Sequence, residues 1–145
     1  MKRLIQPVFV CFALFISTAA GAAPAMPLST LEILKVASVS CAVEDVSDGR
    51  EQTRCDHNGP NIKVYVLERG YGGQPNVTLD GLEVDGVRAP VCNQGEGLVA
   101  CNGAGTTVGH VYTFDLGNKN GGWFEFSNSS LVPPHNRLAV KLYIR

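Results

Sequence analysis

The strongest constraint on the fold is a set of short segments in which apolar residues recur at every second position. Successive side chains of a strand point to opposite faces, so this spacing predicts strands with one buried face. About seven segments show the pattern: residues 31–41, 61–68, 76–79, 82–87, 108–116, 123–127 and 137–144. No segment carries a convincing helical apolar stripe, so the sequence predicts an all-β chain.

Gly, Pro, Asn and Asp separate these segments, as is typical of turns. Asp80-Gly81 favours a tight hairpin turn of the primed type, because both central residues of such a turn need positive φ. Asp85-Gly86 repeats that signal, and Pro133-Pro134 breaks the chain before the last strand. Short strands with turn-rich connections predict a single antiparallel β-sandwich of the immunoglobulin-like type, braced by disulfides, with a small β-barrel as the alternative.

The N-terminus has the layout of a secretory signal peptide. Lys2 and Arg3 precede an apolar core over residues 8–16, and Ala20-Gly21-Ala22 resembles a cleavage site. The apolar core is shorter than the ~20 residues that a membrane-spanning helix needs. We therefore predict a signal peptide over residues 1–22 and a secreted all-β domain over residues 23–145, extracellular or periplasmic and not inserted in a membrane after cleavage.

Charge limits the partners of the secreted domain. The chain has 12 basic and 13 acidic residues, and cleavage after Ala22 removes Lys2 and Arg3 but no acidic residue. The mature domain therefore carries a net charge of −3, ten basic residues against thirteen acidic ones. Nonspecific binding to nucleic acid or to an anionic membrane needs a positive field, so we expect neither partner.

Four cysteines remain after removal of the signal peptide, Cys41, Cys55, Cys92 and Cys101. An even number in an exported chain predicts two disulfides. Three pairings are possible; the local pairing, Cys41–Cys55 and Cys92–Cys101, is favoured because it closes short loops, and crossed pairing stays open. Each bridge would contribute about 2–4 kcal/mol, mainly by restricting the unfolded chain.

Two cysteine-flanked segments, residues 44–57 and 92–107, are predicted as loops because the first is polar and the second is rich in glycine. Zinc is not expected, since Cys-x-x-Cys knuckles are absent and an oxidising compartment disfavours free thiolates. The acidic residues Glu44, Asp45, Asp48 and Glu51 could hold calcium, but their spacing matches no EF-hand loop. We predict no metal and no cofactor.

The glycines of Gly70-Tyr-Gly-Gly73 follow a strand-like run and raise the possibility of a phosphate-binding loop. Such a loop leads directly into a helix, whose N-terminus holds the phosphate. Here Gln74, Pro75 and another strand-like run follow instead. The glycines are therefore predicted to turn the chain between two strands, with Tyr71 packed over an edge.

Three motifs together carry a resemblance to a known family. They are residues 31–38 (LEILKVAS), 66–72 (VLERGYG) and 121–130 (GGWFEFSNSS). In these motifs the chain resembles the YolA-like family of small secreted bacterial proteins, over nearly all of residues 28–144. The resemblance implies an uncharacterised bacterial protein and supplies no catalytic or binding residues.

No catalytic constellation is evident from the sequence. The histidines, His57, His110 and His135, lie in three different segments, and the Gly-x-Ser-x-Gly motif of serine hydrolases does not occur. His57 has a turn composition around it, and His110 is expected on a strand, at the surface or half buried. We predict no catalytic residue and no enzymatic activity.

The aromatic run at residues 123–126 offers the one candidate binding feature. On a strand, Trp123 faces away from the two phenylalanines, which are expected in the core. Trp123 can simply cover the rim, or it can form a stacking platform for a sugar or peptide together with Tyr71 or Tyr112. The sequence thus predicts a secreted, non-catalytic binding module with an unknown protein or glycan partner. The alternatives are a small hydrolase or toxin and, through a braced loop at residues 93–100, a protease inhibitor.

Overall fold

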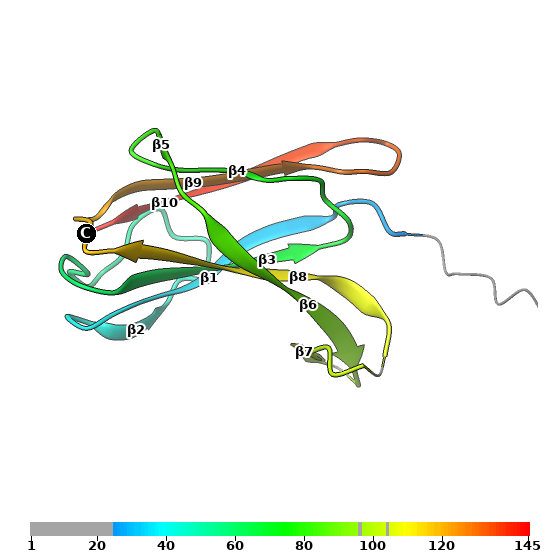
Figure 1. Cartoon of the computed structure of the whole chain (residues 1–145), viewed down its shortest axis with the longest axis horizontal. Coiled ribbons are helices and arrows are strands. Elements are labelled where there is room, and N and C mark those ends of the chain that lie inside the picture. Colours follow the sequence, from blue (N-terminus) through cyan, green and yellow to red (C-terminus); the bar gives the residue numbers. More distant parts are fainter. Residues whose placement is uncertain (1–24, 96, 104) are drawn as a thin grey trace, which may run out of the picture.

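The computed structural model describes residues 25–95, 97–103 and 105–145, so the predicted signal peptide lies outside the described part. Within it the chain forms strands and turns (Figure 1). The strands are β1 (Thr30–Ser38), β2 (Ala42–Asp45), β3 (Ile62–Arg69), β4 (Asn76–Leu79), β5 (Leu82–Glu83), β6 (Gly86–Gln94), β7 (Gly97–Ala100), β8 (Thr107–Gly117), β9 (Gly122–Ser129) and β10 (Arg137–Ile144).

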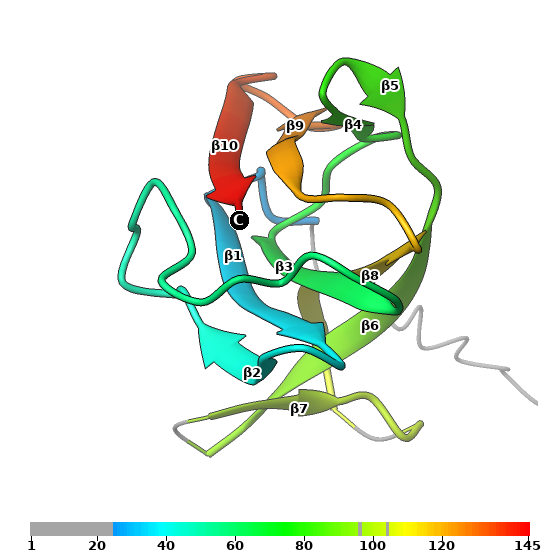
Figure 2. The same cartoon turned by 90° about the vertical axis from the view of Figure 1, so that its left-hand side faces the viewer.

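The strands build two antiparallel sheets that face each other. The larger sheet has the order β2-β1-β3-β8-β6-β7, and the smaller has the order β10-β9-β4-β5. Figure 2 shows the smaller sheet above the larger one, which curls along its width like half a barrel. The predicted all-β class and the two-sheet antiparallel arrangement are confirmed, and the two sheets remain separate in the described chain.

Aromatic side chains from both sheets interlock at the centre of the core. Phe114 on β8 lies 5.4 Å from Phe124 and 5.9 Å from Phe126 on β9, measured between ring centroids. Tyr112 stacks on Phe114 and meets Phe126 edge to face. The contacts with Phe124 and Phe126 cross from one sheet to the other, and tilted or edge-to-face rings stabilise the core beyond their burial of apolar area. The alternation in the sequence therefore places the inward residues correctly.

Both predicted disulfides are present with the local pairing. Cys41–Cys55 has a Cα–Cα distance of 6.1 Å and ties the turn after β1 to the segment before β3. Cys92–Cys101 has a Cα–Cα distance of 5.1 Å and ties β6 to the chain after β7. Each bridge therefore pins a peripheral strand, β2 or β7, that has a neighbour on only one side.

Residues 92–107 are not the simple loop that their glycine content suggests. β6 continues to Gln94 and then pairs antiparallel with β7, with Asn93 opposite Leu98. Gly95 serves the hairpin turn with a φ of 61°, whereas Gly103 and Gly105 lie in the connection between β7 and β8. The prediction was wrong because a short glycine-rich hairpin and a glycine-rich loop have the same composition.

The two Asp-Gly pairs behave differently. Asp80 and Gly81 have φ values of 50° and 78°, so the predicted primed turn between β4 and β5 is confirmed. Asp85-Gly86 is not a hairpin turn, because the chain crosses there from β5 in the smaller sheet to β6 in the larger one (Figure 1). Gly86 is needed for close packing, since a Cβ atom would lie 2.4 Å from Phe114 Cε1.

The polar segment at residues 44–57 is also more ordered than a surface loop. Its first two residues end β2, and Gln52 forms a parallel bridge with Tyr143 on β10. Backbone hydrogen bonds join Thr53 N to Tyr143 O and Tyr143 N to Glu51 O. The segment thus covers the open edge of β10, which would otherwise present unpaired backbone groups to other chains.

The interlocked aromatic core generates the first prediction. Phe126→Ala removes a fully buried ring that contacts both Tyr112 and Phe114, so we expect the free energy of unfolding to fall by about 3–5 kcal/mol. Leu82→Ala, at an exposed position, should change it by less than about 0.5 kcal/mol. Urea unfolding followed by tryptophan fluorescence measures both, and a similar loss in the two variants would contradict the assigned core.

Candidate functional site

The inward face of the sandwich changes from apolar to polar toward one end. On β3, Glu68 follows Val64 and Val66 on the same face, and on β8 His110 precedes Tyr112 on the inward face. On β9, Asn128 takes the next inward position after Phe126. The three polar side chains meet at the end where β3 leads into the turn at residues 70–75.

Glu68 is the centre of this polar cluster and is 0% exposed. Asn128 Nδ2 donates a hydrogen bond of 2.5 Å to Oε2 of the carboxylate. The hydroxyl of Tyr112 and the backbone N–H of Gly72 both donate to Oε1, each at 3.4 Å. A buried carboxylate is costly unless donors surround it, so these bonds hold β3, β9 and the turn together.

The turn after β3 can approach the carboxylate only because it contains glycine. A Cβ atom on Gly72 would lie 2.2 Å from Asn128 Nδ2 and 2.6 Å from Glu68 Oε2. Gly70 has a φ of 89°, which favours glycine at that position as well. The prediction that these glycines turn the chain is confirmed, and their second role is to let the backbone reach a buried charge.

His110 lies beside Glu68 with its Nδ1 atom 3.6 Å from Oε1. This buried Nδ1 makes no hydrogen bond to any described residue. Burial and the positive charge of Arg88 lower the pKa of His110, while Glu68 acts in the opposite direction. The imidazole is therefore held neutral at neutral pH. The sequence placed His110 at the surface or half buried, and the structure buries it more deeply, at 9% exposed.

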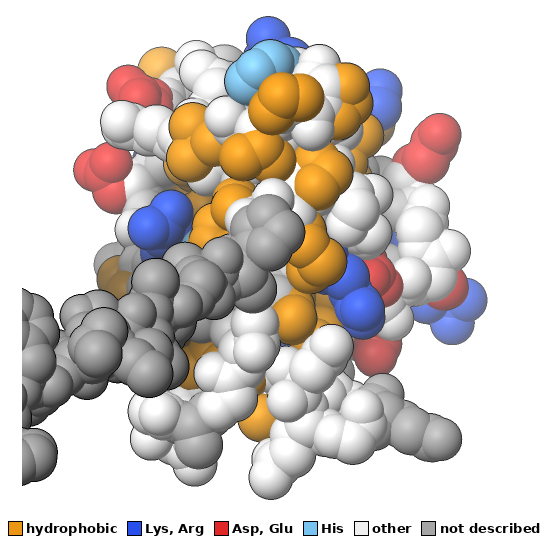
Figure 3. All heavy atoms as spheres, turned by 90° about the vertical axis from the view of Figure 1, so that its right-hand side faces the viewer, with side chains coloured by type: hydrophobic (Ala, Val, Ile, Leu, Met, Phe, Trp, Pro, Cys, Tyr) orange, Lys and Arg blue, Asp and Glu red, His pale blue; other side chains and the backbone are white. Residues whose placement is uncertain are grey.

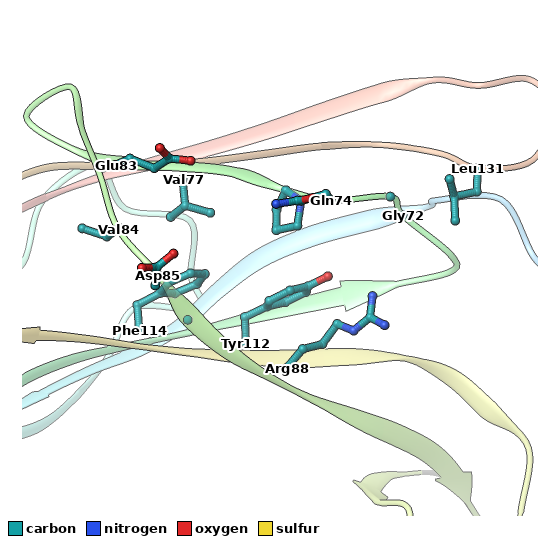
Figure 4. A pocket seen from close by; sticks show the side chains of 13 residues that line it. Gly72, Gln74, Val77, Glu83, Val84, Asp85, Arg88, Tyr112, Phe114 and Leu131 are labelled. Atoms are coloured by element: carbon teal, nitrogen blue, oxygen red, sulfur yellow. The ribbon is translucent and has the colours of Figure 1, made fainter.

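Tyr112 links the buried cluster to an open cleft. Burial and the nearby charge of Glu68 raise the pKa of Tyr112, so its hydroxyl stays protonated and able to donate. Its ring lines a cleft of about 500 Å³ between the two sheets. In Figure 4 the Tyr112 hydroxyl and the Arg88 side chain point toward the Gly72 end of this cleft, and Glu83 and Asp85 lie at the other end.

The cleft has a mixed lining. Val77, Val84 and Leu131 give it apolar walls, and Gln74, Arg88 and the two carboxylates add polar groups. Figure 3 shows the end of the molecule that includes the loop after β9, where hydrophobic side chains form a band bordered by charged ones. Among the described residues, no carboxylate lies within ion-pair distance of Arg88. This guanidinium is therefore available to an anionic group in the cleft.

The structure does not bring the three aromatic candidates together. Tyr112 is 3% exposed and packs on the core rings, so little of its ring is open to a ligand, and its part in the platform stays a prediction. Tyr71 donates from its hydroxyl to Thr107 O and presents its ring to His110. Trp123 is 41% exposed on the outer face of the smaller sheet.

The neighbours of Trp123 differ from those expected. Its ring lies 5.2 Å from that of Tyr143, the residue opposite it on β10. The ammonium of Lys141 lies 5.0 Å from the Trp123 ring centroid. A cross-strand aromatic pair of this kind stabilises the sheet by itself. A role of Trp123 in binding stays a prediction.

A second cluster has the connectivity of a catalytic triad. Ser38 Oγ lies 2.9 Å from His57 Nδ1, and His57 Nε2 lies 3.3 Å from Glu44 Oε2. Ser38 is buried, and its oxygen also accepts the backbone N–H of Cys41. Because the oxygen is engaged and enclosed, the cluster orders the segment around β2. His57 lies outside the strands, as the turn composition around it indicates, but its side chain is 0% exposed.

The acidic residues of this segment point to different partners. Glu44 accepts the backbone N–H groups of Arg54 and Cys55, at 2.8 and 3.0 Å. Asp48 forms an ion pair with Arg50, and Asp45 accepts the Ser47 hydroxyl. In the described chain, these carboxylates do not gather into a group able to hold a metal. The calcium interpretation therefore has no support from this geometry.

Glu68 and Asn128 were not among the predicted site residues, although the sequence carries a signal for both. Each lies at a strand position whose side chain points into the core, and the other inward residues of the same strand are apolar, such as Val66 on β3 and Phe126 on β9. A polar residue at such a position must find a buried partner. The alternation indicates that both are inside, but only the three-dimensional arrangement shows that they meet.

The comparisons with known proteins give one finding. A family model described as a domain of unknown function (DUF4879) matches residues 23–144. No curated protein and no solved structure matches the chain. Among the described residues, no helix is long and apolar enough to cross a membrane.

The depressed pKa of His110 generates a prediction of pH dependence. The folded state favours the neutral imidazole, whereas in the unfolded chain His110 takes up a proton near its ordinary pKa of 6.5. The contribution of His110 to the free energy of unfolding is therefore complete above pH 6.5. It is lost as the pH falls from there through the lowered pKa of the folded state. The free energy of unfolding should decrease over this range, by up to about 1.4 kcal/mol per pH unit.

Replacement of the histidine tests this assignment. His110→Asn should have a flatter dependence of unfolding free energy on pH between 7.5 and 5.5, measured by urea unfolding at each pH. His135→Asn, at an exposed position, should keep the slope of the unsubstituted protein. Equal slopes in the protein and in His110→Asn would show that His110 is not the group responsible.

Proposed function

The chain belongs to the DUF4879 family, a domain of unknown function, and we propose that it is a non-catalytic ligand-binding protein whose site is the cleft beside Tyr112. The observation that carries the proposal is Arg88, a guanidinium without an ion-pair partner among the described residues, on the wall of a cleft of about 500 Å³. Cavities of roughly 300–1,000 Å³ with a few convergent polar groups are typical of small-molecule sites.

The lining indicates the chemistry of the ligand. A guanidinium binds a carboxylate with two parallel hydrogen bonds, so we place an anionic group of the ligand opposite Arg88. Gly72 and Gly73 lie in the same wall and carry no side chain that would keep a ligand away from the backbone. Glu83 and Asp85 at the far end favour an amide or an amine. A short peptide with a free carboxylate carries both groups, the anionic group at one end and an amide or amine further along.

The burial of the acid–base residues supports binding rather than catalysis. Glu68 is enclosed and accepts three hydrogen bonds, and neither Glu68 nor His110 is among the residues that line the cleft. The cluster positions the Tyr112 hydroxyl and the Gly72 turn, which are parts of the cleft wall. The alternative, a small hydrolase or toxin, requires one of the two residues to reach a substrate.

We further propose that the protein is secreted and is YolA-like. The first proposal rests on the signal-peptide pattern before residue 23 and agrees with the two disulfides of the folded domain. The second rests on the short motifs at residues 31–38, 66–72 and 121–130. Neither carries a residue role, so the cleft geometry alone defines the proposed site.

Matched peptides test the proposal. N-acetylated dipeptides with a free carboxylate should shift the amide resonances of Gly72, Gly73 and residues 85–88 in a ¹⁵N–¹H correlation spectrum. The corresponding C-terminal amides should bind more weakly, because the guanidinium then loses its anionic partner. Arg88→Gln should weaken carboxylate binding by about 10–100-fold.

Arg137→Gln is the matched control, because Arg137 is an exposed arginine on the other sheet, hydrogen-bonded to Ser127. It should bind the peptides with unchanged affinity. The proposal is wrong if Arg88→Gln binds as well as the unsubstituted protein. It is also wrong if the shifts map to Trp123 and Tyr143, or if no peptide of the series causes shifts.

A further inference from the structure

Four potential metal ligands meet beneath the hairpin of β1 and β2, away from the residues that line the cleft. A sulfur of Cys41, a carboxylate oxygen of Glu44 and a ring nitrogen of His57 all lie within 4.8 Å of one another. The disulfide adds the sulfur of Cys55 to this group. In the described part of the chain, no other set of three such residues converges in this way.

We propose that reduction of Cys41–Cys55 converts this cluster into a tetrahedral Zn²⁺ site formed by Cys41, Cys55, His57 and Glu44. Two thiolates, an imidazole and a carboxylate are ligand types that zinc accepts together. While the disulfide is closed, both sulfurs are occupied by each other. The closed disulfide therefore prevents zinc binding, and the redox state of the two cysteines controls the affinity of the site for zinc.

The distances already fit the metal. His57 Nε2 and Glu44 Oε2 are 3.3 Å apart. Two ligands at about 2.0–2.1 Å from one zinc ion in tetrahedral geometry are separated by roughly 3.3–3.4 Å. Two thiolates at about 2.3 Å from zinc are roughly 3.8 Å apart. With Cα atoms 6.1 Å apart, rotation of the cysteine side chains can supply that separation once the bond is open.

Neighbouring groups hold the nitrogen and oxygen ligands in position. Ser38 Oγ binds His57 Nδ1 at 2.9 Å, which leaves Nε2 for the metal. Glu44 Oε1 accepts from Arg54 N at 2.8 Å and from the Arg50 guanidinium at 2.9 Å, and Oε2 accepts from Cys55 N at 3.0 Å. The carboxylate is thus anchored, and Oε2 keeps a lone pair for zinc. Such outer contacts are a regular part of zinc sites, because they fix the tautomer and orientation of each ligand.

The site has an access route from solvent. A depression of about 460 Å³ is lined by both cysteines, Glu44, Arg50 and Arg54. A metal ion or a small reductant can therefore reach the sulfurs without opening the core. The two arginines also offset charge, because zinc with two thiolates and one carboxylate carries a net charge of −1.

The chemistry balances with a dithiol as the reductant. The dithiol gives two electrons and two protons to the Cys41–Cys55 bond, which breaks to form two thiols, and the dithiol becomes a disulfide. Zinc then displaces the two thiol protons to solvent as its bonds to sulfur form. His57 binds through Nε2 and keeps its proton on Nδ1, where Ser38 Oγ accepts it.

The second disulfide provides an internal control. Near Cys92 and Cys101, the side-chain oxygen in reach is Thr107 Oγ1, 4.0 Å and 3.7 Å from the two sulfurs. In the described structure, no histidine or carboxylate joins these two cysteines in a potential metal-binding group. Reduction of this bridge should therefore create no tetrahedral site of comparable affinity.

The test uses Co²⁺ as a spectroscopic substitute for zinc, in a chain carrying Cys92→Ser and Cys101→Ser. After reduction with a phosphine, which does not compete as a thiol ligand, one Co²⁺ per chain should give sulfur-to-cobalt charge-transfer bands and the visible bands of tetrahedral cobalt. Zinc should displace the cobalt. The oxidised chain should give neither set of bands, and the Cys41→Ser/Cys55→Ser chain should not give them when reduced.

Ligand variants complete the test. His57→Asn and Glu44→Gln should each weaken cobalt binding by at least about 10-fold, and Ser38→Ala by roughly 10–100-fold. His135→Asn and Glu125→Gln, both exposed, should leave it unchanged. The proposal is overturned if the reduced chain shows no charge-transfer bands, or if His57→Asn and Glu44→Gln bind as tightly as their parent.

If the reduced chain is unfolded without metal, a second measurement tests the proposal. In that case zinc is titrated while the near-ultraviolet circular dichroism is recorded. Recovery of the native signal at one zinc per chain supports the site, because binding to folded ligands then drives folding. Failure to recover the signal overturns it.

Discussion

The buried carboxylate of Glu68 is the interaction on which the polar half of this molecule depends. It lies on β3 of the larger sheet, binds Asn128 on β9 of the smaller sheet, and accepts the backbone of Gly72 in the turn that leads to β4. Removing its donors would leave a buried charge without compensation, which costs several kcal/mol. The polar end of the sandwich is therefore held by a few directional bonds, whereas the aromatic end is held by packing.

This division explains why the cleft lies where it does. Phe114, Phe124 and Phe126 fill the space between the sheets at the centre of the core. Tyr112 donates its hydroxyl to Glu68 beside these rings, and the same residue lines the cleft. The chain that crosses from β5 to β6 lines one side of the cleft, and Arg88 on β6 faces it. A ligand site beside a rigid hydrogen-bonded wall follows from the same bonds that join the sheets.

The sequence predicts the strands and the disulfides well, because both depend on local spacing. The alternation of Ile62, Val64 and Val66 is enough to orient β3, and the Asp80-Gly81 turn follows from its φ requirement. Buried polar residues in irregular segments are harder to predict. His57 and Glu44 lie in a polar segment that suggests a solvated loop, yet the Cys41–Cys55 bridge and the pairing with β10 fold that segment against the domain. The proposed zinc site was not predictable from cysteine spacing for a related reason. Its four ligands come together through the pairing of β1 with β2 and not through a short sequence motif.

The most direct test of the central claim is a double-mutant cycle between Glu68 and Asn128. Glu68→Ala, Asn128→Ala and the double variant are unfolded in urea at pH 7.5, and the coupling free energy is the departure from additivity. A charge-assisted bond in a buried site predicts a coupling of about 1.5–3 kcal/mol, with the double variant less destabilised than the sum of the single variants. Single-variant effects that add to within about 0.5 kcal/mol would show that the carboxylate does not join the two sheets.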